Sequence, residues 1–270
     1  MQIALTIAGS DSGGGAGIQA DLKTFQRFGV FGTSVVTAIT AQNTLGVTAV
    51  HPIPVEIVEA QLAALAADLA PAAIKSGMLG TAAIVRAVAA VLPQHRFVPY
   101  ILDPVMVSTS GARLLDADAE SEIRERLVPL ATLVTPNLDE AAILAGFRVS
   151  DGSGMERAGR KLLDLGAGAA LMKGGHLPGG DVVDILVTQG GAQRFTHSRL
   201  KTTSTHGTGC TLSAAVAAGL AKRVGGWTAG RRVPPDALAA AVSDALDYVH
   251  RAIATAPGLG QGHGPLNHSA

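Results

Sequence analysis

Residues 205–210 read Thr-His-Gly-Thr-Gly-Cys and run directly into the helical pattern Thr211-Leu212-Ser213-Ala214-Ala215-Val216. A helix that begins in this way directs its unpaired N–H groups and the positive end of its dipole at whatever lies in front of it. The glycines let a phosphate approach the backbone closely. Cys210, the one thiol of the chain, falls at the same place, where the dipole favours its ionised form. We expect an anion site here; the alternative is that the small residues only allow tight helix packing and that Cys210 is a buried apolar residue.

Short β-type runs alternate with helical patterns along the rest of the chain. The runs are Ile3 to Ala8, Ser34 to Ile39, Ala73 to Ser76, Tyr100 to Val105, Leu133 to Thr135, Ala169 to Lys173, Val182 to Thr188 and Gln193 to His197. Apolar residues between them share helical faces, as do Ile123, Leu127 and Leu130. This rhythm predicts an α/β fold whose mostly parallel sheet carries helices on both faces and ligands at the carboxyl ends of its strands.

The second half departs from this rhythm. Two strand-like runs flank Gln189-Gly190-Gly191, which predicts a hairpin and therefore an antiparallel edge of the sheet. The loop of residues 174–180 contains four glycines and predicts either a hinge over a site or a loop without function. With 270 residues, 47% of them hydrophobic, the chain is expected to form one large domain over residues 1–270.

Charge and composition exclude several classes of partner. The 21 basic and 21 acidic residues cancel, so no overall field attracts nucleic acid or an acidic membrane. Apolar stretches are too short to cross a bilayer, and the first residues lack the pattern of a secretory leader. A single cysteine suits a reducing compartment. We expect a cytoplasmic protein with a small-molecule ligand and with neither nucleic acid nor a membrane as partner.

Two familiar nucleotide motifs are missing. Gly13, Gly15 and Gly17 are followed by Ile18, so the third glycine of a dinucleotide-binding loop is absent. No Gly-Lys-Ser or Gly-Lys-Thr triplet closes a Walker loop. A nucleotide bound by this chain must therefore use another anion hole.

Three charged residues follow predicted strands. Asp103 ends an apolar run, and a carboxylate at such a place needs a partner. Glu140 follows Asn137 at the spacing of a capping box, so it either caps a helix or orders a magnesium ion through its waters. Lys173 precedes two glycines, where its ammonium group either meets a phosphate or is simply solvated.

Together these segments resemble one family. They are residues 8–21, 41–44, 75–79, 103–106, 135–140, 171–176, 206–210 and 262–265. In this order, over essentially the whole chain, they are similar to the bacterial hydroxymethylpyrimidine/phosphomethylpyrimidine kinases of thiamine biosynthesis. The resemblance implies a ribokinase-like three-layer α/β sandwich, with ATP and Mg²⁺ as cofactors and usually a homodimer. It also implies transfer of the γ-phosphoryl group of ATP to 4-amino-5-hydroxymethyl-2-methylpyrimidine, and then to its monophosphate.

The resemblance also implies a role for each matching residue. Gln42 would read the amino group and ring nitrogen of the pyrimidine with its amide. The substrate pocket would be lined by Gly9, Ala16, Asp21, Met78 and Val105. Cys210 would lie near the substrate hydroxyl, and the N–H groups of Gly207, Thr208 and Gly209 would stabilise the transferring phosphoryl group. Lys173 would meet the phosphates, with Thr208 and Gly209 beside the nucleotide. Asp103 and Glu140 would order Mg²⁺.

One position departs from the family pattern. Leu246 stands where relatives often carry a lysine near the nucleotide phosphates. The chain therefore either binds ATP more weakly, or Lys201 or Lys222 replaces the missing ammonium group. Two other functions stay open at this point. One is a pyridoxal or pyridoxine kinase of the same fold, and the other is a pyrimidine-binding sensor without turnover.

Overall fold

The computed structural model describes residues 1–270 except residues 95–98, 107–114, 116, 176, 178 and 224–232. Its strands are β1 (Ile3–Asp11), β2 (Phe31–Asn43), β3 (Gly46–Pro52), β4 (Ala73–Ser76), β5 (Tyr100–Leu102), β6 (Leu133–Val134), β7 (Ala169–Met172), β8 (Asp181–Thr188) and β9 (Gly191–Ser198). They form one sheet in the order β3-β2-β1-β4-β5-β6-β7-β8-β9. Six of these strands, which are neighbours in the order β2-β1-β4-β5-β6-β7, pair in parallel. The sheet is therefore mostly parallel, as the βαβ rhythm predicts.

Antiparallel strands close both edges of the sheet. The hairpin β8–β9 pairs through Thr188 and Gly191, so the predicted turn is formed by Gln189 and Gly190. On the other edge β3 pairs antiparallel with β2. The sequence analysis did not predict this second edge, because β3 is largely exposed and has no alternation of buried and exposed residues.

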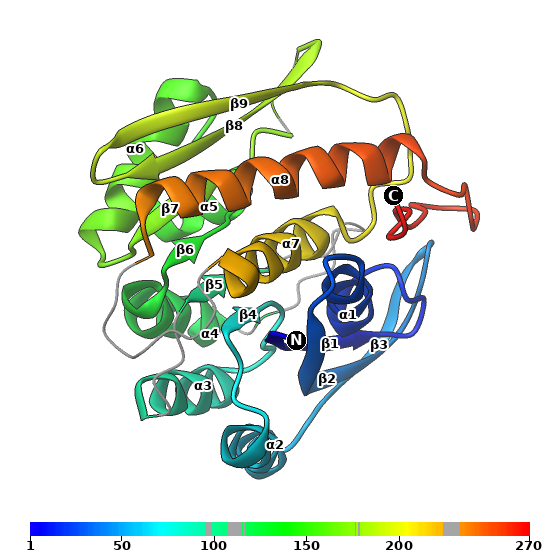
Figure 1. The fold of residues 1–270 in the computed structure, drawn as a ribbon, viewed down its shortest axis with the longest axis vertical. Helices are drawn as coiled ribbons and strands as arrows, with labels where there is room; N and C mark the ends of the chain where they lie inside the picture. The colour runs from blue at the N-terminus through cyan, green and yellow to red at the C-terminus, as the bar shows by residue number, and fades with distance from the viewer. Residues whose placement is uncertain (95–98, 107–114, 116, 176, 178, 224–232) are drawn as a thin grey trace.

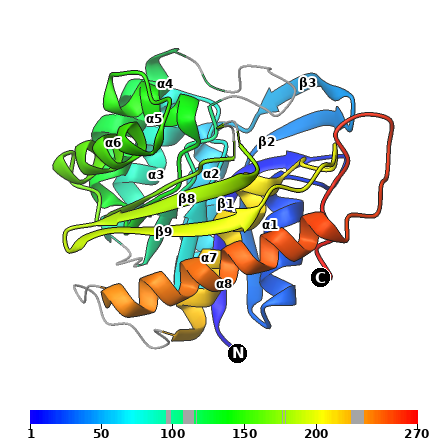
Figure 2. The same cartoon turned by 90° about the horizontal axis from the view of Figure 1, so that it is seen from above.

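Helices cover both faces of the sheet (Figure 2). Their bounds are α1 (Gly17–Arg27), α2 (Val55–Asp68), α3 (Ala82–Gln94), α4 (Ala117–Glu122), α5 (Leu138–Ala145), α6 (Gly152–Asp164), α7 (Thr208–Arg223) and α8 (Pro235–Ala254). One face carries α1, α7 and α8, and the other carries α2 to α6 (Figures 1 and 2). Alternate strand residues feed the two cores: Ala4 packs on the side of α1 and α7, and Leu5 on the opposite side.

Several predicted strands end earlier than expected. The run from Tyr100 to Val105 forms a strand only to Leu102, because Pro104 has no N–H to donate to a neighbouring strand. Ile123, Leu127 and Leu130 share a helical face that packs on the core, as predicted. The helix there is a π-helical segment η1 (Ile123–Leu127) followed by a 3₁₀ turn η2 (Val128–Leu130). Within the described residues, no helix is both long and apolar enough to cross a membrane.

Candidate active site

The N-terminus of α7 lies against the loop that precedes α1. Gly207 has a φ of +84°, and a Cβ there would lie 1.9 Å from the carbonyl oxygen of Gly15, so only glycine fits. Because α7 begins at Thr208, the N–H groups of Gly209 and Cys210 have no acceptor within the helix. The N–H of Thr208 instead donates to Thr205 at 3.3 Å. Of the predicted donors Gly207, Thr208 and Gly209, the N–H of Thr208 is thus already used, and the helix terminus offers those of Gly209 and Cys210. Binding of an anion there stays a prediction.

Lys173 and Asp103 meet in front of this helix terminus. The Lys173 ammonium group donates to Asp103 Oδ1 at 3.0 Å, and Asp103 also accepts from Thr135 and Ser213, each at 3.2 Å. A Cβ on Gly209 would lie 3.1 Å from Lys173 Nζ, which places the ammonium group directly beside the backbone of α7. Burial alone would lower the pKa of Lys173, but the charges of Asp103 and Glu140 outweigh burial and raise it. The ammonium group is therefore charged at neutral pH.

Glu140 caps α5, as one of the two expectations from its spacing predicted, and it also lies near Lys173. Its N–H donates to Asn137 Oδ1 at 3.0 Å and its Oε2 accepts from the Asn137 N–H at 2.9 Å, so the capping box is complete. The same carboxylate oxygen lies 4.0 Å from Lys173 Nζ. Burial, together with the charge of Asp103 and despite that of Lys173, raises the pKa of Glu140. Helix capping thus holds this carboxylate in the cluster with Asp103 and Lys173.

The surroundings of Cys210 differ from the expectation. Burial raises the pKa of its thiol to about 11, although Lys75 and a hydrogen bond from the backbone of Gly17 act in the opposite direction. The thiol is therefore protonated at neutral pH, and the ionised form that the dipole was expected to favour is not its resting form. Desolvation depends on everything packed around the thiol, and it outweighs the local dipole.

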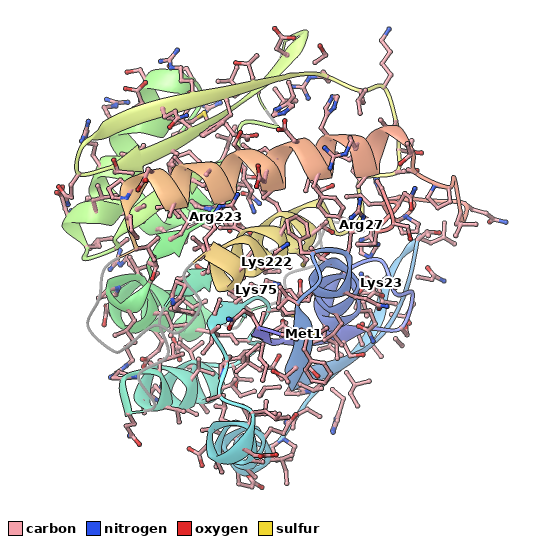
Figure 3. The ribbon with its side chains drawn as sticks, viewed as in Figure 1. Met1, Lys23, Arg27, Lys75, Lys222 and Arg223 are labelled. Atoms are coloured by element: carbon pink, nitrogen blue, oxygen red, sulfur yellow. The ribbon has the colours of Figure 1, made fainter. Side chains whose placement is uncertain are left out.

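Asp21 lies deeper than a pocket-lining residue. Both of its side-chain oxygens accept from Lys75 Nζ, at 2.8 and 3.0 Å, and Thr6 donates to one of them at 2.6 Å. Neither Lys75 nor Asp21 is exposed to solvent. Figure 3 labels Lys75 on β4, under the layer formed by α1 and α7. The carboxylate of Asp21 is therefore occupied by a buried ion pair that the sequence analysis did not identify.

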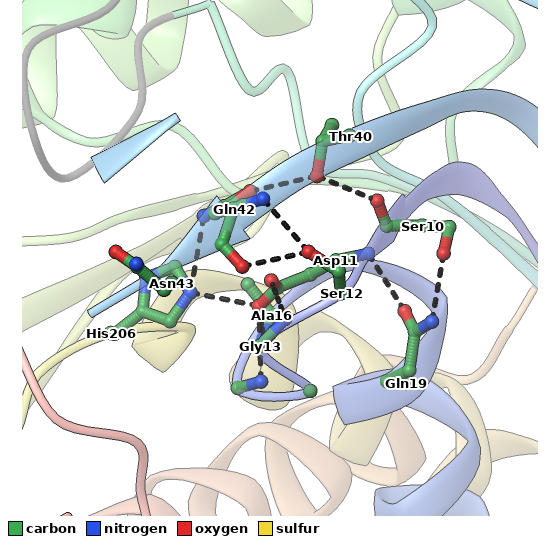
Figure 4. A network of polar contacts seen from close by, with 12 residues as sticks. Ser10, Asp11, Ser12, Gly13, Ala16, Gln19, Thr40, Gln42, Asn43 and His206 are labelled. Carbon is green, nitrogen blue, oxygen red and sulfur yellow. Dashed lines mark hydrogen bonds and ion pairs between the residues drawn. The ribbon is translucent and has the colours of Figure 1, made fainter. Parts of the chain in front are cut away.

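The loop between β1 and α1 is organised around Asp11. The carboxylate of Asp11 accepts from the N–H groups of Gly13 at 2.8 Å, Gly15 at 3.0 Å and Ala16 at 2.8 Å. His206 Nε2 lies 2.9 Å from the same carboxylate. This contact ties the loop before α1 to the residue that precedes Gly207 (Figure 4).

Four predicted pocket residues lie at or near this loop. Gln42 is near the end of β2, and its Nε2 lies 3.2 Å from His206 Nε2. A Cβ on Gly9 would lie 3.4 Å from Met78 Cε, so the missing side chain of Gly9 makes room for the thioether of Met78. Ala16 caps α1 without a side-chain hydrogen bond. The structure thus brings Gln42 and Ala16 to one loop and places Met78 over Gly9.

Val105 follows Asp103 and Pro104 with a φ of +29°. A positive φ in a β-branched residue is strained, and such strain persists only where the surrounding structure imposes it. Val105 is half-buried and stands beside the carboxylate cluster in the chain.

Lys222 lies at the C-terminal end of α7, about 18 Å along the helix from Cys210, so it is not placed to compensate for Leu246. Leu246 itself is buried in the core between α7 and α8.

In the glycine-rich loop, the Arg199 side chain donates to the carbonyl groups of Gly175, Leu177 and Gly179. His176 and Pro178 of this loop lie outside the described residues.

Comparisons with known proteins agree with this architecture. Residues 11–267 match the family model described as phosphomethylpyrimidine kinase. The hydroxymethylpyrimidine/phosphomethylpyrimidine kinase of Rhizobium meliloti is 50% identical over 270 residues, covering 98% of this chain and 96% of that protein. The thiamine biosynthesis bifunctional protein ThiED of Geobacter sulfurreducens is 48% identical over 98% of this chain, which spans about half (51%) of its length.

A solved structure has the same fold. An ADP complex of Bacillus subtilis pyridoxal kinase superposes with a TM-score of 0.88 at 37% identity and covers 100% of this chain and 98% of that one. The mostly parallel sheet with helices on both faces, together with this likeness, places the fold among the ribokinase-like kinases. The chain belongs to the phosphomethylpyrimidine kinase family.

Proposed function

We propose that this chain transfers the γ-phosphoryl group of ATP to 4-amino-5-hydroxymethyl-2-methylpyrimidine, and then phosphorylates the monophosphate, in thiamine biosynthesis. The printed names of the relatives support this reaction and pathway. The observation that carries the proposal is the convergence of the α7 N-terminus with Lys173 and Asp103, since Gly209 and the ammonium group lie side by side. Phosphoryl transfer depends mainly on positioning and on the neutralisation of charge, and this arrangement supplies both.

Lys173 and the N–H groups of Gly209 and Cys210 bind the phosphates in this proposal. The ammonium group leaves Asp103 or shares it when a phosphate arrives, since it is a mobile donor with three protons. Gly207 and Thr208 hold the turn that aims these N–H groups, through the φ of Gly207 and the bond from Thr208 Oγ1 to Thr205 at 2.8 Å.

Asp103 and Glu140 fit a magnesium ion held mainly through water and phosphate oxygens. Among the residues that the structure describes, no group of three or more His, Cys, Asp or Glu side chains forms a metal cage. Two carboxylates beside a lysine suit Mg²⁺, which keeps several waters and binds few protein ligands. When bound, the ion would neutralise charge on the transferring phosphoryl group.

Gln42, Gly9, Ala16, Met78 and Val105 form the substrate side of the proposal. Met78 supplies an apolar wall over Gly9, and the Gln42 amide supplies a donor and an acceptor for the ring. Asp21 does not contact the substrate in this proposal; its buried ion pair with Lys75 supports the pocket.

Cys210 is proposed to lie at the substrate hydroxyl. Because burial raises the pKa of the thiol to about 11, its resting form at neutral pH is the protonated one. The thiol therefore does not serve as a standing base. The hydroxyl keeps its proton until the alcohol oxygen has largely bonded to phosphorus, which a loose transition state tolerates, and the proton then passes to an oxygen of the transferred phosphoryl group. Cys210 positions the hydroxyl, since its sulfur is a weak hydrogen-bond partner.

Pyridoxal is a second candidate substrate. A pyridoxal kinase with a TM-score of 0.88 shares the whole fold, so the fold alone does not separate the two ring systems. The pyrimidine is preferred because the relative that is 50% identical is named for it. A non-catalytic sensor is disfavoured by the intact pairing of Lys173 with Asp103.

We further propose that the chain acts as a single domain, as a homodimer and in the cytoplasm. These three statements rest on the family resemblance and on composition. Gel filtration with light scattering tests the dimer, with an apparent mass near twice 27.3 kDa as the expected result.

The proposed reaction is tested by incubating the protein with ATP, Mg²⁺ and either the hydroxymethylpyrimidine or its monophosphate, with products resolved by ³¹P NMR. We expect the first to give the monophosphate and then the diphosphate, and the second to give the diphosphate directly. Cys210→Ala should retain binding of both and lose most of the turnover. Failure of the wild-type protein to phosphorylate either compound would refute the proposal.

A further inference from the structure

The carboxamide of Gln42 is held between two polar partners (Figure 4). Thr40 Oγ1 lies 3.2 Å from Gln42 Oε1, and His206 Nε2 lies 3.2 Å from Gln42 Nε2. The oxygen and the NH₂ group of a carboxamide have nearly the same shape, so their true positions follow from what each partner can donate or accept. The positions of the Gln42 oxygen and NH₂ group therefore follow from whether Thr40 and His206 each donate or accept.

Thr40 has a single hydroxyl proton. The carbonyl oxygen of Ser10 lies 2.9 Å from Thr40 Oγ1, closer than the Gln42 oxygen at 3.2 Å, and it can only accept. Once the proton is given to Ser10, the Thr40 oxygen has only lone pairs left to offer Gln42. The group of Gln42 that faces Thr40 should therefore be the donor, NH₂.

His206 gives the same answer from the other side. Its Nε2 lies 2.9 Å from the carboxylate of Asp11. Burial alone would raise the pKa of Asp11, but the hydrogen bonds from His206, Ala16 and Gly13 outweigh burial and lower it, so the carboxylate is ionised and can only accept. His206 Nε2 must then carry a proton, and a protonated ring nitrogen has no lone pair for an NH₂ group. The group of Gln42 that faces His206 should therefore be the acceptor, Oε1, which shares the single Nε2 proton of His206 with the closer carboxylate of Asp11 in a three-centre hydrogen bond.

We propose that Asp11, His206 and Thr40 lock the Gln42 carboxamide with Nε2 toward Thr40 and Oε1 toward His206, and that this locked orientation selects the substrate ring. The first half of this inference stands on the contacts alone, and the second rests on the proposed function. Thr40, His206 and Asp11 are thus positioning residues that act through Gln42.

The locked amide leaves a defined pair of groups for a ligand. Oε1 has two lone pairs, of which His206 uses one, and Nε2 has two protons, of which Thr40 uses one. One acceptor and one donor remain side by side on the same amide. They complement a heterocycle that carries an exocyclic amino group next to a ring nitrogen, and a ring without that amino group leaves the Gln42 oxygen unpaired.

The orientation is tested first without substrate. In protein labelled with [¹⁵N]glutamine, the NH₂ signal of Gln42 is identified by its loss in Gln42→Leu. We expect stronger cross-relaxation from these protons to the Thr40 methyl group than to the ring protons of His206. The reverse order of intensities would overturn the inference, whatever the protein phosphorylates.

The effect on selectivity is tested with a pair of substrates that differ only in the amino group, 4-amino-5-hydroxymethyl-2-methylpyrimidine and its desamino analogue. We expect Thr40→Val to lower the preference in kcat/KM for the amino compound about tenfold, mainly through KM, with kcat changed less than threefold. Thr40→Ser, which keeps the hydroxyl, should restore the preference. The control is Thr33→Val, on the same strand as Thr40. It removes a comparable hydroxyl, which donates to the carbonyl oxygen of Ala4 at 3.3 Å, and it should leave the preference unchanged.

The outcomes separate the two claims. An equal loss for both substrates in Thr40→Val would show a merely structural role for Thr40 and overturn the selectivity claim. Absence of turnover of the pyrimidine by the wild-type protein would refute the proposed function and, with it, the claim about ring selection. The cross-relaxation experiment would then still decide the orientation of Gln42.

Discussion

The Lys75 ammonium group lies 2.8 Å from a carboxylate oxygen of Asp21, and neither side chain is exposed to solvent. A buried charge that loses its partner is costly, because the remaining charge is neither solvated nor neutralised. The pair joins β4 to α1, and its charges act on the thiol of Cys210, so it supports the part of the fold on which the site depends.

Lys75→Met should therefore destabilise the protein by about 3–5 kcal/mol, measured by urea unfolding. The double variant Lys75→Met/Asp21→Leu should recover much of this loss, since it removes both charges together. Lys23→Met, which removes an exposed ammonium group that donates to Gly14, serves as the control and should change stability by less than about 1 kcal/mol. A single variant as stable as this control would contradict the importance of the buried pair.

Lys173→Met should lower kcat about 10²–10³-fold, because it removes the cation placed to meet the phosphates. Steady-state kinetics at saturating ATP and Mg²⁺ measures this effect. Lys222→Met removes an exposed lysine at the far end of α7 and should leave kcat unchanged. Equal effects of the two variants would show that Lys173 has no special role.

The thiol of Cys210 should react slowly with iodoacetamide at neutral pH. With a pKa of about 11, only about one part in 10⁴ is thiolate at pH 7. The alkylation rate, followed by mass spectrometry, should rise about tenfold per pH unit from pH 7 to 9.5 without a plateau. A plateau below pH 8 would mean that the thiol ionises readily and would restore the role of the helix dipole.

Gly207→Ala should abolish most of the activity, because its Cβ would overlap the carbonyl oxygen of Gly15 and the residue would keep a strained positive φ. We expect a loss of more than about 10²-fold in kcat/KM, reflecting displaced N–H groups at α7. Gly190→Ala, in the β8–β9 turn, places its Cβ 3.6 Å from the nearest atom and should be close to wild type. Near-normal activity of Gly207→Ala would refute the close approach of these two loops.

Features of the fold that depend on a few neighbouring residues were predictable from the sequence. The Asn137–Glu140 spacing predicted a capping box that the structure contains. Residues 205–210 predicted a helix terminus, which the structure places at Thr208, three residues before the expected start of the helical pattern. The mostly parallel sheet and the β8–β9 hairpin followed from alternating patterns and a turn signal.

Contacts between distant segments were not predictable in the same way. Asp11 and His206 are 195 positions apart, and Asp21 and Lys75 are 54 apart, so no local pattern joins them. The pKa of Cys210 was misjudged for the same reason, since its largest cause is burial by residues from elsewhere in the chain. The exposed edge strand β3 was missed because it carries little apolar periodicity.

The central claim is that this kinase acts on the aminopyrimidine. It is tested most directly by competition, with equal concentrations of 4-amino-5-hydroxymethyl-2-methylpyrimidine and pyridoxal in one reaction with ATP and Mg²⁺, and with both phosphorylated products measured by mass spectrometry. The account predicts that the pyrimidine phosphate is formed in large excess from the first turnovers. Predominant formation of pyridoxal phosphate would contradict it.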